Sequence, residues 1–168
     1  MHHYSFIAEQ FAPYTQVINV NEFGNGNIND TYLVTIDTAL PEEKQFVMQR
    51  INTQVFKQPR LIMQNMRAFT EHMRRRARQE GYRWEMPRVI PALDGHDFYI
   101  DSEGSFWRAI SYVHGARSFN TIKDIEIARE VGYALGTFQS LISDLPVDQL
   151  ADTLEGFHIM PRYLQNFD

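Results

Sequence analysis

A segment rich in glycine and asparagine, FGNGNINDTYLV at residues 23–34, has the residue types that suggest chemistry most directly. Glycine has no Cβ, so backbone N–H groups in such a segment can approach and donate to phosphate oxygens. The following residues have strand character and no Gly-Lys-Ser/Thr occurs, which argues against a dinucleotide fold or a Walker loop. Two interpretations remain: a glycine loop that covers phosphate groups, and a plain hairpin turn.

The other polar residues give weaker indications of a chemical site. The histidines show no metal-ligand spacing, and four acids around one turn are ordinary solvent-facing residues there: Asp94, Asp97, Asp101 and Glu103. The run RRRAR at 74–78 lies at the end of a predicted helix, where cations suit the negative end of the helix dipole. We therefore predict no metal site from the residues of this chain.

Composition limits the classes of protein that the sequence can belong to. The chain has 168 residues, 43% of them hydrophobic and 13% aromatic, which is enough for a packed core. A net charge of −5 does not favour a nucleic-acid partner. The absence of cysteine excludes disulfides and thiolate chemistry, and no apolar run is long enough to span a membrane. We expect no membrane association and a cytoplasmic protein.

Hydrophobic periodicity predicts the elements that position the glycine segment. Apolar residues alternate at 15–23, 30–37 and 44–51, which predicts three antiparallel strands with the glycines between the first two. Three- and four-residue spacing predicts an amphipathic helix at 59–79. The remaining predicted elements are a short helix at 4–12 and extended runs at 87–93, 97–102 and 105–113.

The character of the chain changes after residue 113. Asp124 is a suitable N-cap for a long helix at 124–145, which carries an apolar stripe that includes Val131 and Leu135. One helix cannot bury its own stripe, so this helix needs a partner surface, either a helical lobe or a second copy of the chain. We predict two domains, one at 1–113 and an incomplete helical one at 114–168.

The motifs resemble those of the aminoglycoside phosphotransferase and choline kinase superfamily. That superfamily has two glycines, an asparagine and then Tyr-x-Val, matched here by Gly24, Gly26, Asn29, Tyr32 and Val34. The stretches GNGNINDTYLV, FVMQRINTQVFKQP and MQNMRAFTEHM are most similar to N-acetylhexosamine 1-kinases, which phosphorylate an amino sugar with ATP. The resemblance implies an α+β fold: a protein-kinase-like N-lobe, with an antiparallel sheet of about five strands and one helix, plus the first helix of an α-helical C-lobe.

The resemblance also implies a nucleotide site. The loop would cover the ATP phosphates, a strand residue would reach them, two valines would sandwich adenine, and the backbone of the hinge would bind its edge. Where the superfamily usually has a lysine this sequence offers Gln49 or Arg50, and alternation along the strand leaves open which of them faces the cleft. The helix partner of that cation is equally open, since Glu71 comes late and Gln64 or Asn65 occupies the expected place. The implied set is Gly24, Asn25, Gly26, Asn27, Asn29, Val34, Val47, Gln49, Arg50, Ser111, Tyr112 and Val113.

Phosphoryl transfer in this superfamily needs a His-x-Asp-x4-Asn-like loop and a further Asp that binds Mg²⁺. Neither motif occurs in the 168 residues, so the Mg²⁺ ligands would lie in a C-lobe outside them. We expect this chain alone to be inactive, whether it is truncated, split or naturally short. The alternative is a non-catalytic nucleotide-binding or protein-interaction module built on a kinase-like lobe.

Overall fold

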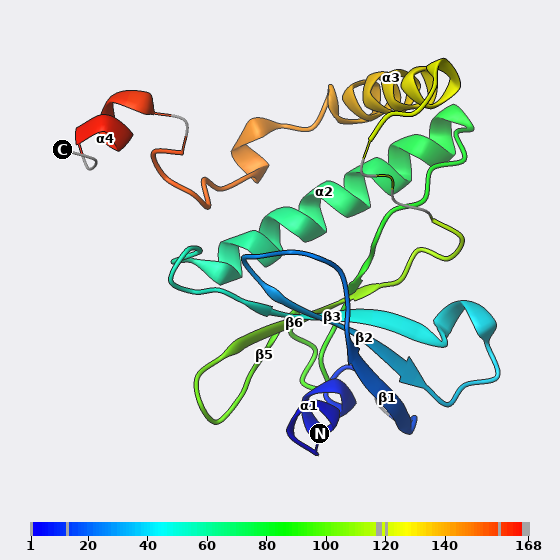
Figure 1. Ribbon diagram of the computed structural model, residues 1–168, viewed down its shortest axis with the longest axis vertical. Helices are drawn as coiled ribbons and strands as arrows, with labels where there is room; N and C mark the ends of the chain where they lie inside the picture. The colour runs from blue at the N-terminus through cyan, green and yellow to red at the C-terminus, as the bar shows by residue number, and fades with distance from the viewer. Residues whose placement is uncertain (1, 13, 117–118, 120, 158, 166–168) are drawn as a thin grey trace.

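An antiparallel sheet with helices on both faces forms the main body of the protein (Figure 1). The computed structural model describes residues 2–12, 14–116, 119, 121–157 and 159–165. Its elements in chain order are α1 (His2–Glu9), β1 (Val17–Glu22), β2 (Asp30–Ile36), the 3-10 helix η1 (Pro41–Glu43), β3 (Gln45–Ile51), α2 (Pro59–Glu80), β4 (Val89–Ile90), β5 (Tyr99–Ile100), β6 (Phe106–Ser111), α3 (Ile125–Ile142), the 3-10 helix η2 (Val147–Gln149) and α4 (Met160–Gln165). The strand order is β1-β2-β3-β6-β4, and β5 also pairs with β6.

The predicted α+β class with an antiparallel sheet is confirmed, and two of the six strands are shorter than the extended runs suggested. Strand β4 pairs with β6 through only Val89 and Ile90. Pro87 and Pro91 flank these residues, and proline has no N–H to continue a ladder. Strand β5 ends before a turn that Asp101 closes by accepting the backbone N–H groups of residues 103 and 105.

One face of the sheet packs on α1. Side chains alternate along a strand, so Tyr32, Val34, Met48 and Trp107 all point to this face and are almost fully buried. They pack against apolar residues of α1 and the turn after it, with Phe11 among them. Each large side chain buried in this way contributes about 1.5–3 kcal/mol to stability, so this layer holds the strands in a fixed register.

The other face of the sheet packs on α2, which crosses it diagonally (Figure 1). Ile51 and Phe106 of the sheet contact Met63 of this helix. Pro59 starts the helix, where its missing N–H is not needed, and Gly81 ends it in the left-handed region with φ 72°. The predicted helix at 59–79 is thus confirmed to within one residue.

Helix α3 lies alongside the C-terminal half of α2 (Figure 1), where Leu141 packs against Met73 and Ala77. The predicted N-cap is confirmed, because the Asp124 carboxylate accepts the N–H of Ile127 at 2.9 Å. The helix ends at Ile142, three residues before the predicted end. Neither η2 nor α4 was predicted.

Much of the apolar stripe of α3 has no covering element. Val131 and Leu135 are 51% and 56% exposed. The whole chain exposes 12069 Å², whereas a compact monomer of its mass exposes about 8,600 Å². The excess is consistent with a helical region that has few packing partners of its own.

Within the described residues, no helix combines the length and the apolar character needed to cross a bilayer.

Candidate nucleotide site

The glycine segment forms the connection between β1 and β2. The N–H of Phe23 donates to the carbonyl of Thr31 at 2.9 Å and closes the base of a hairpin, so both sequence interpretations share this geometry. Gly24 has φ 84°, which favours glycine, whereas Gly26 lacks a positive φ and a Cβ added there would meet nothing within 4 Å. The loop therefore leaves open space at Gly26, and its backbone is accessible to a ligand. Asn25 and Asn27 are exposed beside it.

Asn29 fixes the end of the loop. Its side-chain oxygen accepts the N–H of Asn52 at 2.9 Å, which ties the loop to the residue that follows β3. Because the side-chain oxygen of Asn29 is occupied by this hydrogen bond, Asn29 would contribute to a phosphate site by positioning the loop.

The two candidate strand residues lie on opposite faces of the sheet. Gln49 pairs in register with Thr31 on β2 and Arg108 on β6, and all three side chains lie on the α2 face. Arg50 pairs with Asp30 and Trp107, and Trp107 belongs to the core on the α1 face. Gln49 therefore faces α2, and Arg50 faces α1.

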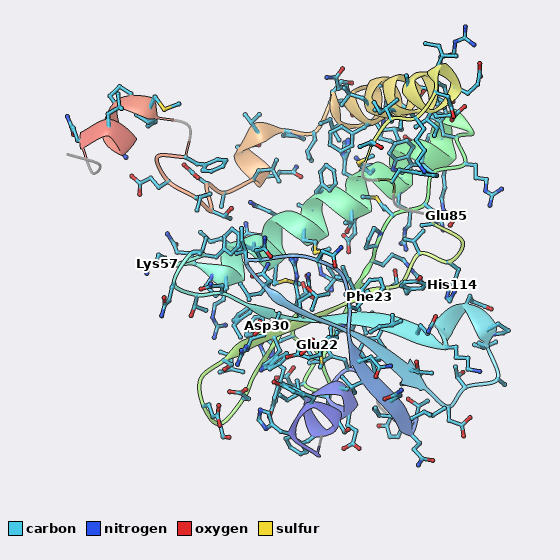
Figure 2. All side chains as sticks on the ribbon, viewed as in Figure 1. Glu22, Phe23, Asp30, Lys57, Glu85 and His114 are labelled. Carbon is cyan, nitrogen blue, oxygen red and sulfur yellow. The ribbon has the colours of Figure 1, made fainter. Side chains whose placement is uncertain are left out.

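Arg50 is held away from the α2 face. Its Nε donates to the Asp30 carboxylate at 2.7 Å, and its guanidinium lies 5.9 Å from the centre of the Trp107 ring. The hydrogen bond to Asp30 raises the pKa of Arg50. Of the two residues that the sequence left open, Arg50 is therefore the one that strand alternation and this ion pair direct away from α2 (Asp30 is labelled in Figure 2).

A row of hydrogen bonds crosses three strands beneath the loop. The Gln49 amide nitrogen donates to the Thr31 hydroxyl at 2.9 Å. The Gln49 oxygen accepts two bonds from Arg108, from Nε at 3.0 Å and from Nη2 at 2.7 Å. Burial lowers the pKa of Arg108. Sequence reasoning missed Arg108; its signal was a single basic residue inside the otherwise apolar strand FWRAIS, but its position opposite Gln49 depends on the register.

The helix residue that faces this row is Met66, whose sulfur lies 3.5 Å from Nη1 of Arg108. Among the described residues no carboxylate of α2 pairs with Arg108, so the ion pair between strand and helix that the resemblance implies does not form there. Asn65 instead makes two hydrogen bonds with the backbone of Ala151, at 2.7 and 2.8 Å, and fixes the C-terminal segment on α2.

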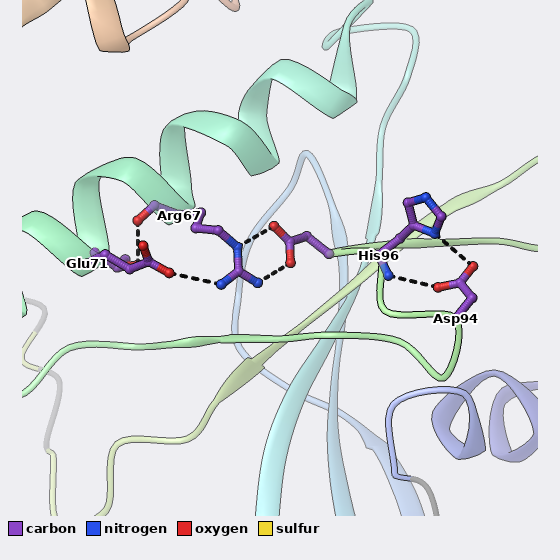
Figure 3. A network of polar contacts seen from close by, with 6 residues as sticks. Arg67, Glu71, Asp94 and His96 are labelled. Carbon is purple, nitrogen blue, oxygen red and sulfur yellow. Dashed lines mark hydrogen bonds and ion pairs between the residues drawn. The ribbon is translucent and has the colours of Figure 1, made fainter.

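Glu71 belongs to a different network, which Figure 3 shows. Arg67 donates to Glu71 at 2.9 Å and also pairs with Asp97. The hydrogen bond to Asp97 is the largest cause of a raised pKa for Arg67. In the same view His96 and Asp94 contact each other within their own turn, as expected for turn residues.

The two valines expected to sandwich adenine lie on opposite faces. Val34 is fully buried in the core against α1, whereas Val47 lies on the α2 face. Leu33, directly opposite Val47 in the register and half-buried, is the apolar β2 residue on that face. The expectation for Val34 is corrected, because an alternating strand cannot present residues 34 and 47 to one ligand in this register.

The predicted hinge, residues 111–113, begins at the last residue of β6. The Ser111 hydroxyl accepts the N–H of Arg88 at 2.9 Å. The Tyr112 ring packs against the rings of Phe23 and His114, with distances between ring centroids of 5.9 Å and 5.0 Å. Phe23 and His114 are labelled in Figure 2. No backbone hydrogen bond of Val113 is found among the described residues. The base of the glycine loop and the hinge therefore meet through aromatic rings.

A cavity of about 450 Å³ lies elsewhere, between α2, β4 and the end of α1, and shares only Ser111 with the predicted site. Its lining mixes arginine, glutamate and apolar residues and does not resemble a base pocket. In the described part of the chain no three His, Asp or Glu side chains come together to hold a metal, so these residues do not fit a Mg²⁺ site.

Comparisons with known proteins identify the fold. No family model matches the chain. Its structure is similar to that of APH(2")-IIia in complex with GDP and kanamycin, with a TM-score of 0.57 and 14% identity over 89% of this chain and 44% of that one. A mutant of aminoglycoside 2'-phosphotransferase IIIa in complex with GDP gives a TM-score of 0.54 and 12% identity over 98% of this chain and 51% of that one. The chain thus spans about half the length of these enzymes and has the fold of their kinase-like N-lobe.

Proposed function

We propose that this chain is the nucleotide-binding lobe of a kinase-like phosphotransferase. The observation that carries the proposal is the sheet face beneath the glycine loop, where apolar Leu33 and Val47 stand beside the polar row that includes Gln49. The base would lie on the two apolar residues and bond the hinge backbone at Ser111 and Val113. The phosphates would lie under residues 24–29, with Tyr112 near the opening.

The nucleotide in this proposal is ATP. Both similar structures are GDP complexes, which supports a purine nucleotide site in this fold without assigning one to this chain. ATP is favoured by the motif resemblance to N-acetylhexosamine 1-kinases. A cytoplasmic location follows from the same proposal, because the substrate is then a cytoplasmic nucleotide.

The acceptor that we propose is the anomeric hydroxyl of a small amino sugar. The stretches GNGNINDTYLV and QRIN support this class, and the kanamycin bound to one similar protein is itself an amino-sugar compound. The residues that bind the acceptor would come from a helical lobe. That lobe would also supply the catalytic Asp and the Mg²⁺ ligands, which the 168 residues do not contain. Transfer would then require this chain and that lobe together.

The division into a lobe at 1–113 and a helical part at 114–168 belongs to the same proposal. The uncovered stripe of α3, with Val131 and Leu135 exposed, supports contact with further helices. The same stripe favours the second candidate function, a non-catalytic module that binds a partner or a second copy of itself through α3. The two candidates differ in what the chain does with ATP once a helical lobe is present.

Two measurements on one preparation separate these functions. Calorimetric titration of ATP into the chain tests the nucleotide site, with Leu33→Ala as the variant and Ile18→Ala, on the exposed edge strand β1, as a matched control. ADP release with Mg²⁺ and a GlcNAc/GalNAc panel, measured on the chain alone and with a kinase C-lobe attached after residue 145, tests transfer. ATP binding with sugar-dependent ADP release only in the extended form supports the kinase. Binding without release in either form supports a non-catalytic nucleotide-binding module. Absence of ATP binding contradicts the kinase and that module, and leaves a protein-interaction module that acts through α3.

A further inference from the structure

The polar row contains a positive charge that no carboxylate of the described residues neutralises. Arg108 is half-buried between the sheet and α2, and its only side-chain partners among these residues are the Gln49 oxygen and the Met66 sulfur. Arg50 and Arg67, by contrast, each pair with an aspartate. A guanidinium keeps its charge in a folded protein, so Arg108 is a cation without an anion.

The sheet offers no other cation on that face. The six strands contain two basic residues, Arg50 and Arg108, and Arg50 points to the α1 face. The nearest lysines in sequence to β3, Lys44 and Lys57, lie outside the strands and are exposed, and Figure 2 shows Lys57 at the N-terminal end of α2. A negatively charged ligand on the α2 face therefore has one strand cation to meet.

The partners of Arg108 hold the guanidinium in one orientation. The Gln49 oxygen accepts from Nε and Nη2 on one edge of the group, and Met66 lies against Nη1. Three of the five N–H donors are used in this way, so two remain for an oxyanion. Thr31 holds the Gln49 amide from the opposite side and stands two residues after Asn29, at the end of the glycine loop.

We propose that Arg108 on β6, oriented by Gln49, provides the positive charge that binds the nucleotide phosphates on the α2 face. This inference rests on the proposed nucleotide function, and it names a residue that comes from a different strand than the expected one. Gln49 then positions the guanidinium and carries no charge to the phosphate. A planar guanidinium suits this role, because its parallel N–H groups match two oxygens of one phosphate.

The experiment compares three probes on wild type, Arg108→Met, Arg108→Lys and Arg50→Met. The probes are ATP, adenosine, which lacks phosphate, and tripolyphosphate, which lacks the base. Loss of a charge-assisted contact should weaken ATP and tripolyphosphate by about 10- to 100-fold in R108M. Adenosine affinity should stay within about two-fold of wild type, R108K should recover part of the loss, and R50M should bind all three probes as wild type does.

The melting temperature of R108M separates the proposed role of Arg108 from a purely structural one. Because the charge is uncompensated, its replacement by Met should leave the melting temperature of the free protein unchanged or raised, while the increase produced by ATP is lost. A lower melting temperature with equal losses for ATP and adenosine overturns the inference. Equal ATP affinity in R108M and wild type also overturns it and leaves the proposed function standing. Wild-type protein that binds none of the three probes overturns the proposed function itself.

Discussion

Gln49 and Arg108 face each other across β3 and β6, and the Gln49 oxygen lies 3.0 Å from Nε and 2.7 Å from Nη2 of the arginine. This contact joins the strand that follows the glycine hairpin to the strand that leads into the hinge.

A double-mutant cycle on Gln49→Leu and Arg108→Met measures this contact. Each single change removes the same pair of hydrogen bonds, so their effects should not add. Q49L should lower the free energy of unfolding by about 1–3 kcal/mol, because the half-buried guanidinium loses its acceptor. We expect a coupling energy of about 1–2 kcal/mol from urea unfolding of the four proteins. Strict additivity would mean that the contact contributes nothing.

The two loop glycines should respond differently to alanine. Gly24→Ala places a Cβ on a backbone with φ 84° and should lower the free energy of unfolding by about 1 kcal/mol. Gly26→Ala meets open space at an ordinary φ, so stability should change by less than about 0.5 kcal/mol. If a phosphate approaches this backbone, G26A should nevertheless weaken ATP binding in calorimetry. Unchanged ATP affinity in G26A would favour the plain hairpin.

Neighbouring positions on β2 should separate stability from binding. Val34→Ala leaves a cavity in the α1-side core and should lower the free energy of unfolding by about 1–3 kcal/mol without changing affinity of the folded protein for adenosine. Leu33→Ala, on the α2 face, should have the smaller effect on stability and weaken adenosine binding. Denaturant unfolding and adenosine titration of both variants test this. If Val34→Ala weakened adenosine binding and Leu33→Ala did not, the base would lie on the other face of the sheet.

Asp101 should make stability depend on pH in acid. Burial opposes its ionisation, yet hydrogen bonds from the Trp107 ring and the N–H groups of Ser105 and Glu103 outweigh it and lower the pKa of Asp101. A folded-state pKa below the unfolded value of about 3.9 means that the carboxylate stabilises the fold above that pH. This stability should be lost as pH falls through the folded-state pKa.

Asp101→Asn provides the matched comparison, since its amide does not ionise in this range. The free energy of unfolding from urea titrations between about pH 7 and 2.5 should fall more steeply for wild type than for D101N below about pH 4. Parallel curves would show that Asp101 does not contribute to the acid dependence.

Residue patterns predicted the elements well and the faces of the strands poorly. The helix at 59–79 was recovered because Pro59 and Gly81 mark its ends and its apolar spacing is clear. The run TYLVTI has adjacent apolar residues at 32, 33 and 34, and alternation alone did not say whether Leu33 or Val34 points to α2. The β-sheet register, which no local pattern specifies, decided that question.

The same limit applies to the candidate site. Gln49 and Arg50 were equivalent choices until pairing with β2 and β6 assigned them to opposite faces. Arg108 lies 59 residues beyond Gln49 and is brought to it only by the β3–β6 pairing. The turn at Gly24 could be predicted from local sequence because turn chemistry is local, whereas a partner across a sheet depends on tertiary structure.

Titration of ATP into the wild-type chain and into R108M tests the nucleotide site and the role of Arg108 together. We expect saturable binding to wild type with a Kd of about 1 mM or tighter, and an affinity about ten-fold or more lower in R108M. Absence of saturable binding to wild type would contradict the nucleotide site, and equal affinities would contradict the role of Arg108.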